Sequence, residues 1–98
     1  MTAPEPIGLG SLKLVIGCGI DATLADRIGT EIAPHVRADD VRRAGDAIIV
    51  YTDAEPGQIR DWLAPALRDG ESVLVVEFER WSSRGDAVDR TWLLRRGH

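Results

Sequence analysis

The stretch that decides the fold is residues 46–80, which read DAIIVYTDAEPGQIRDWLAPALRDGESVLVVEFER. Residues 47–52 are a nearly continuous apolar, β-branched run, which is typical of a strand covered on both faces. A second apolar run at residues 73–76 predicts another strand whose first half is centrally buried. From Glu77 onward polar and apolar residues alternate, so the far end of this strand is expected to reach solvent.

The segment between these two runs predicts a helix with defined ends. Asp53 or Glu55 can cap its start, and Pro56 lies at or near the first turn, where a missing N–H costs nothing. Pro65 should kink or divide the helix, because it removes one backbone hydrogen bond and clashes with the preceding turn. Gly70 supplies a left-handed stop. Five apolar residues spaced i, i+3, i+4, i+7 and i+8 form one helix face: Ile59, Trp62, Leu63, Ala66 and Leu67.

The N-terminal half of the chain repeats this strand–helix order. Residues 1–10 hold two prolines and two glycines and are expected to form a flexible leader. Residues 11–17 alternate in a way that predicts a strand with at least one buried face. Asp21 or Thr23 can cap the following helix, and Pro34 sets its end, because the residue before a proline avoids the helical region. The apolar stripe of this helix recurs every four residues: Leu24, Ile28, Ile32 and Val36.

Two further segments leave the secondary structure open. Residues 35–45 are charged and fit either a short edge strand or a plain loop. Residues 90–95 fit either a closing strand or a helical turn. Two helices on one face of a mainly antiparallel sheet predict a single α+β domain over residues 11–98, with the ferredoxin-like split β-α-β arrangement. Without a strand at residues 35–43, the same elements would form a small, three-stranded parallel α/β unit of Rossmann-like type.

Composition narrows the class of protein further. The 98 residues carry a formal net charge of −4, which argues against a nucleic-acid partner because phosphate binding needs a basic face. The apolar runs are too short to span a bilayer, and the start of the chain has no secretory signal. Cys18 is the single cysteine, so a disulfide within the chain is impossible, which fits a reducing cytoplasm.

Residues 48–81 resemble the SinR-like small proteins, relatives of the CRISPR-associated ribonuclease-like and VapD-like proteins. Members of that group show a strand ending in threonine and aspartate, a helix resembling EQIRD, and then a strand of LLVV type. The resemblance covers about a third of the chain. The residues that carry it are Thr52, Asp53, Gln58, Ile59, Arg60, Asp61, Leu74, Val75, Val76 and Trp81.

This resemblance implies a ferredoxin-like fold, a homodimer and a defence, toxin–antitoxin or phage-borne context. It also implies, for some relatives, cleavage of nucleic acid with a metal held by an aspartate after the first strand. In this chain Gly17, Cys18 and Gly19 follow the first apolar run, and Asp21 comes a few residues later. The displaced aspartate argues against nuclease activity.

The turn after the first strand also matches a nucleotide-binding pattern. Residues 17–22, GCGIDA, fit the variant dinucleotide fingerprint G-x-G-x-x-A, in which Gly17 and Gly19 let the backbone approach a pyrophosphate. Asp39 follows Gly19 by twenty residues, where a ribose-binding acid would be expected. However, Asp21 places a negative charge beside the phosphate position, so a tight strand-to-helix turn is the competing interpretation.

The same turn offers two further candidates. Asp21, together with Asp39 and Asp40, could bind a metal ion, although paired aspartates are more often solvated charges or helix caps. Cys18 could act as a nucleophile, because a helix N-terminus lowers a thiol pKa, but a small buried apolar side chain is the simpler interpretation. The sequence therefore predicts no catalytic residue, cofactor or bound metal.

Aromatic residues near the C-terminus suggest a binding surface instead. By strand parity Trp81 lies on the same face as Glu77, and Trp92 is surrounded by charges. Tryptophans exposed among charges are enriched at protein interfaces. We therefore select Phe78, Trp81 and Trp92 as candidate interface residues; the alternative is that the two tryptophans pack together and close a small core.

These observations favour a non-enzymatic protein-binding module that forms a homodimer through its sheet edge or its C-terminal strand. Two alternatives stay open. One is a metal-dependent nuclease of the resembling family, and the other is a minimal dinucleotide-binding domain built on the turn at residues 17–19.

Overall fold

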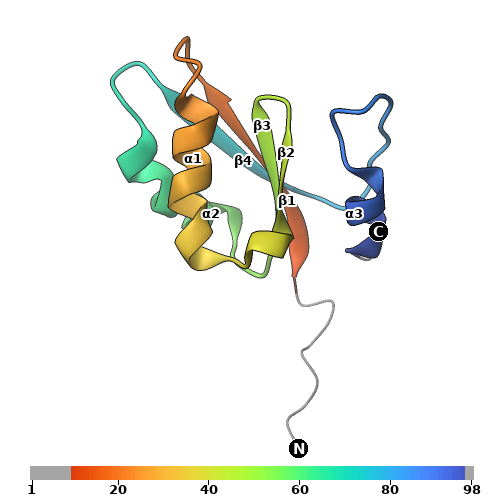
Figure 1. Cartoon of the computed structure of the whole chain (residues 1–98). Coiled ribbons are helices and arrows are strands. Elements are labelled where there is room, and N and C mark those ends of the chain that lie inside the picture. The colour runs from red at the N-terminus through yellow and green to blue at the C-terminus, as the bar shows by residue number, and fades with distance from the viewer. Residues whose placement is uncertain (1–9, 97–98) are drawn as a thin grey trace, which may run out of the picture.

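The computed structural model describes residues 10–96, so nearly all of the predicted leader lies outside the described residues. Figure 1 shows the elements in chain order. They are β1 (Ser11–Cys18), α1 (Leu24–Ile32), β2 (Val41–Ala44), β3 (Ala47–Thr52), α2 (Pro56–Leu63), β4 (Ser72–Phe78) and α3 (Arg90–Arg95). Three single 3₁₀ turns, Ala33–His35, Ala38–Asp40 and Ala64–Ala66, lie between them.

The four strands form one sheet in the order β2-β3-β1-β4, and all neighbouring strands are antiparallel. Helices α1 and α2 lie on one face of this sheet, and α3 lies on the other (Figure 1). We call these the helical face and the second face. The α+β class is therefore confirmed, whereas the parallel three-stranded alternative is wrong.

That alternative fails because residues 41–44 form a strand. Strand β2 pairs with β3 from Val41 opposite Val50 to Ala44 opposite Ala47, which leaves a two-residue loop between them. Gly45 in this loop has φ +64, a conformation that glycine adopts without steric cost. The charges of β2 are tolerated because β2 is an edge strand.

The helix predicted after β3 forms with the expected ends. Glu55 is the N-cap, its side chain and that of Gln58 make a reciprocal capping box, and Pro56 occupies the first turn. Pro65 divides the helix as predicted, because α2 ends at Leu63 and a 3₁₀ turn follows. Gly70 has the expected positive φ, +83, but it lies in the turn before β4 rather than at the helix end.

Two apolar clusters pack on the two faces of the sheet. The buried residues of the helical-face cluster are Val15, Leu24, Ile28, Ile32, Ile48, Val50, Ala54, Ile59 and Leu63. Those of the second-face cluster are Leu12, Ile49, Trp92 and Leu93. Strand β3 contributes to both clusters, which confirms the prediction that it is covered on both faces.

Strand β4 differs from its prediction. It is an edge strand, so residues 73–76 are not centrally buried, and the side chain of Leu74 is 52% exposed. The prediction of a centrally buried strand is wrong because an apolar, β-branched run fits both a central strand and an apolar edge strand. Residues 90–95 form helix α3, with the Asp89 carboxylate accepting a hydrogen bond from the backbone N–H of Trp92 at 3.0 Å.

Candidate functional site

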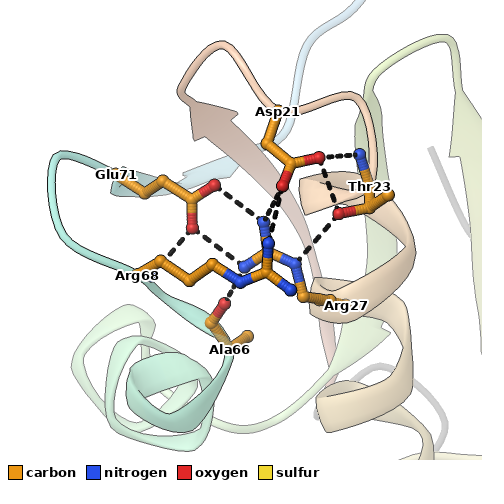
Figure 2. Close-up of polar contacts among 6 residues, drawn as sticks. All are labelled: Asp21, Thr23, Arg27, Ala66, Arg68 and Glu71. Carbon is orange, nitrogen blue, oxygen red and sulfur yellow. Dashed lines mark hydrogen bonds and ion pairs between the residues drawn. The ribbon is translucent and has the colours of Figure 1, made fainter.

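The turn after β1 is held by a group of charged side chains that Figure 2 shows in detail. We call Asp21, Arg27, Arg68 and Glu71 the charge cluster. It joins the β1–α1 turn to the segment before β4, over sequence separations of 44 residues for Arg27 and Glu71 and 47 residues for Asp21 and Arg68.

Arg27 is the centre of the charge cluster. Its Nη1 and Nη2 donate to the two carboxylate oxygens of Glu71 at 2.8 and 2.7 Å, a bidentate geometry. Nη1 also donates to the carbonyl of Ala66, and Nε donates to the Thr23 hydroxyl at 3.2 Å. All of these partners come from outside the sheet, so Arg27 fixes α1 against the segment that leads into β4.

Asp21 fixes the start of helix α1 through hydrogen bonds with the N-cap residue, Thr23. Its Oδ1 accepts from the backbone N–H of Thr23 at 2.8 Å and from the Thr23 hydroxyl at 2.7 Å. Thr23 is the N-cap residue, but its own side chain makes no capping hydrogen bond. The other carboxylate oxygen, Oδ2, accepts from Arg68 Nη1 at 2.7 Å and lies 3.5 Å from Arg27 Nη2.

These contacts favour the charged forms of the acids. The pKa of Asp21 is lowered mainly by the two Thr23 hydrogen bonds, with smaller contributions from the charges of Arg68 and Arg27. The pKa of Glu71 is lowered mainly by the Arg27 hydrogen bonds and then by the backbone N–H of Arg68. The pKa of Arg27 is raised, chiefly by Glu71. The cluster therefore consists of two carboxylates and two guanidinium groups that compensate one another.

The balance of charges in the cluster bears on the prediction that Asp21 could bind a metal ion. Both oxygens of Asp21 already accept hydrogen bonds, and two arginines stand beside them, which opposes a divalent cation. Asp39 and Asp40 lie in the turn before β2, away from Asp21. Within residues 10–96, no three His, Cys, Asp or Glu side chains are grouped so as to hold a metal ion.

The nucleotide candidates are not brought together. Strands β1 and β2 both run antiparallel to β3, and Gly17 and Gly19 lie at the end of β1 whereas Asp39 precedes the start of β2. They therefore lie at opposite ends of the sheet. Gly17 has a packing role, because a Cβ there would come within 2.9 Å of side-chain atoms of Leu24 and Ile28. Cys18 is exposed at the same end, so the prediction of a buried thiol is wrong.

The predicted interface residues all lie in the second-face cluster. Trp92 is only 1% exposed, and its indole N–H donates to the carbonyl of Asp39 at 2.6 Å. Phe78 and Trp81 are partly buried against the same cluster. The parity argument for Trp81 is wrong, because β4 ends at Phe78 and the alternation of faces does not extend to Trp81. The two tryptophans thus help to close a core.

A sheet edge with exposed apolar side chains lies instead along β4. Its residues 72–76, SVLVV, include no charge and no proline, whereas the opposite edge strand, β2, carries Arg42 and Arg43. On the second face, Ile16 pairs with Leu74 and Leu14 with Val76. We call these four partly exposed residues the open patch. Sequence reasoning missed it because β4 was expected in the centre of the sheet.

The fold and this edge define a small α+β domain with one protected and one unprotected sheet edge. No protein-family model, curated protein or solved structure matches the chain. Among the described helices, none has the length and apolar character needed to cross a membrane.

The charge cluster predicts acid sensitivity. Asp21 and Glu71 have lowered pKa values in the folded chain, so between about pH 5 and pH 3 the unfolded chain takes up protons first and stability falls. Glu71→Gln should lower the melting temperature at pH 7 and flatten its decline in acid. Thermal unfolding followed by circular dichroism measures both effects.

Asp61→Asn provides the matched control for this experiment. Asp61 also accepts hydrogen bonds from an arginine, Arg60, but both side chains are well exposed. Exposed ion pairs contribute little to stability, so this variant should follow the wild-type curve. Equal slopes for Glu71→Gln and wild type would contradict the assignment.

Proposed function

We propose that this chain is a protein-binding module with a ferredoxin-like fold, which associates with a second copy of itself through the outer edge of β4. The topology supports the fold: α1 connects β1 to β2 and α2 connects β3 to β4, and in each case another strand lies between the two. The observation that carries the function is the uncharged stretch of β4, residues 72–76, beside the open patch. Such an edge readily accepts another strand.

An antiparallel pairing of two β4 strands centred on Val75 fits the sequence of the edge. Leu74 then faces Val76 of the second copy, so the open patches of the two copies become neighbours. Glu77 faces Val73 of the second copy, and therefore no like charges stand opposite each other within the paired residues 72–78. A two-fold axis perpendicular to the sheet joins the two copies into one eight-stranded sheet, with α1 and α2 of both copies on the same side.

The charge cluster supports a binding rather than a catalytic role. Hydrogen bonds from Thr23 to Asp21 and from Arg27 to Glu71 lower the pKa values of these carboxylates and favour their ionised forms, so they are poorly suited to exchange protons near neutral pH. A cytoplasmic location suits the exposed thiol of Cys18, since free thiols persist in reducing compartments. A defence, toxin–antitoxin or phage-borne setting is part of the proposal and rests on the resemblance of residues 48–81 alone.

Leu74→Arg is expected to convert the dimer into a monomer. The variant places a charge on each side of the two-fold axis, next to the same charge from the second copy. Sedimentation velocity or light scattering on a sizing column measures the mass. Leu94→Arg is the matched control, because Leu94 on α3 is similarly exposed, at 59%, but lies away from β4. A monomeric wild type, or a Leu74→Arg variant that dimerises as tightly as wild type, would overturn the proposal.

A further inference from the structure

The chain covers part of its own second face with its C-terminal residues 79–96, which we call the tail. The tail follows directly after β4. Its residues 79–89 form no helix or strand, and its last residues form α3 (Figure 1). Trp92 and Leu93 of α3 are buried in the second-face cluster against Leu12 and Ile49. The tail thus fills an apolar site that the sheet provides.

Polar contacts fix the position of Trp92 in this site. Its indole donates to the carbonyl of Asp39, and the guanidinium groups of Arg42 and Arg96 lie 5.4 and 5.0 Å from its ring centroid. Arg96 also pairs with Asp40 at 3.0 Å. The residues around this site, Asp39, Asp40 and Arg42, therefore suit a tryptophan followed four positions later by an arginine.

Side chains, not backbone pairing, hold the tail in place. Among the described residues, no backbone–backbone hydrogen bond links residues 80–96 to the sheet or to the two long helices. Within that described part of the chain, three buried side-chain N or O atoms have no hydrogen-bond partner in the protein, and all belong to the tail: Trp81 Nε1, Ser83 Oγ and Arg96 Nε. Buried polar groups without partners cost free energy, so the tail covers the second face with part of its hydrogen-bonding capacity unmet.

We propose that the second-face site is an exchangeable docking site for a capped Trp-Leu helical turn, and that residues 89–96 of a second copy can occupy it in place of the chain's own. The fit of this occupant follows from the contacts above, because a second copy brings the same side chains. The linker of residues 79–89 can extend to about 36 Å, which allows its tail to reach another copy. Exchange of a terminal element is a low-cost route to association.

A peptide test uses the full-length chain. The probe is a labelled synthetic peptide, VDRTWLLRR, which copies residues 88–96. Trp92→Ala vacates the site, so fluorescence anisotropy should show saturable binding at least about tenfold tighter than to wild type, whose site is occupied in cis. Trp62→Ala is the control, because Trp62 packs on the helical face. A peptide with alanine in place of its tryptophan should not bind.

Equal binding to Trp92→Ala and Trp62→Ala, or no binding to folded Trp92→Ala, would overturn the docking site. If Trp92→Ala does not fold, the double variant Asp89→Ala, Arg96→Ala replaces it. That variant loosens the tail but keeps the buried tryptophan. It too should bind the peptide more tightly than wild type, and failure there would refute the proposal.

Exchange between copies is tested separately from β4 pairing. In the Leu74→Arg background, chains labelled at the single Cys18 with a donor or an acceptor are mixed. Energy transfer that rises with concentration, and disappears on adding the peptide in excess, supports tail exchange. Peptide binding without energy transfer would overturn the second copy as the occupant. Loss of β4 dimerisation affects neither outcome, so the two proposals fail independently.

Discussion

Replacing Trp92 with alanine is expected to lower the free energy of unfolding by about 3–5 kcal/mol, the range for deleting a large buried aromatic side chain. Trp92 is the largest fully buried side chain among residues 10–96, and it joins the tail to the second face of the sheet. The substitution removes its apolar contacts and leaves the Asp39 carbonyl without the indole donor. Urea unfolding followed by circular dichroism measures the loss.

Two further variants identify the source of this effect. Trp92→Phe keeps most of the apolar volume but loses the indole N–H, so its cost should be intermediate. Trp62→Ala should cost less than Trp92→Ala, because Trp62 is only partly buried and stacks on the exposed His35 ring at a centroid distance of 4.1 Å. A Trp92→Ala variant as stable as wild type would show that the tail contributes nothing to the fold.

Lys13→Ala is expected to destabilise the chain by about 2–4 kcal/mol, because it deletes a long buried stem. Lys13 is only 2% exposed in the centre of the sheet. Its ammonium donates to Ser11 Oγ at 2.6 Å and to the Thr52 carbonyl at 2.7 Å, and it lies 3.6 Å from Glu77. The substitution therefore removes packing and also deprives these acceptors of a donor.

Lys13→Met separates the two contributions. Methionine keeps a similar volume, and replacing a buried charge with an apolar side chain is often close to neutral. The change in the free energy of unfolding should therefore stay within about 1.5 kcal/mol. Chemical unfolding of both variants at pH 7 makes the comparison. If methionine costs as much as alanine, the ammonium contacts rather than the stem hold this site together.

Local chemistry was sufficient to predict much of the fold. The Glu55–Gln58 capping box, Pro56 at the helix start and Pro65 at its end are all set by residues a few positions apart, so α2 was predicted closely. Strand β3 was predicted for a similar reason, because its continuous apolar run requires cover on both faces. The short β2 strand stayed open, since its four residues VRRA are stabilised by pairing with β3 rather than by their own composition.

The site depended on contacts between distant residues and was predicted less well. Asp21 was noticed as a possible metal ligand, but its partner Arg68 is 47 positions away and gives no local signal. The position of β4 at the edge depends on strand order, which an apolar run does not encode. Trp92 was recognised as unusual, yet its burial depends on the carbonyl of Asp39, in a turn whose structure the sequence left undecided.

The charge cluster has a consequence for the folding pathway of the chain. Its ion pairs join α1 to the segment before β4, and we infer that they form late, after the two halves of the domain have docked. Interactions that are absent from the transition state slow unfolding and leave the folding rate nearly unchanged. The ion pair between Arg27 and Glu71 is therefore expected to slow unfolding and so lengthen the lifetime of the folded chain. In acid, where protonation of Asp21 and Glu71 removes the ion pairs and leaves the arginine charges, the domain should unfold faster without refolding more slowly.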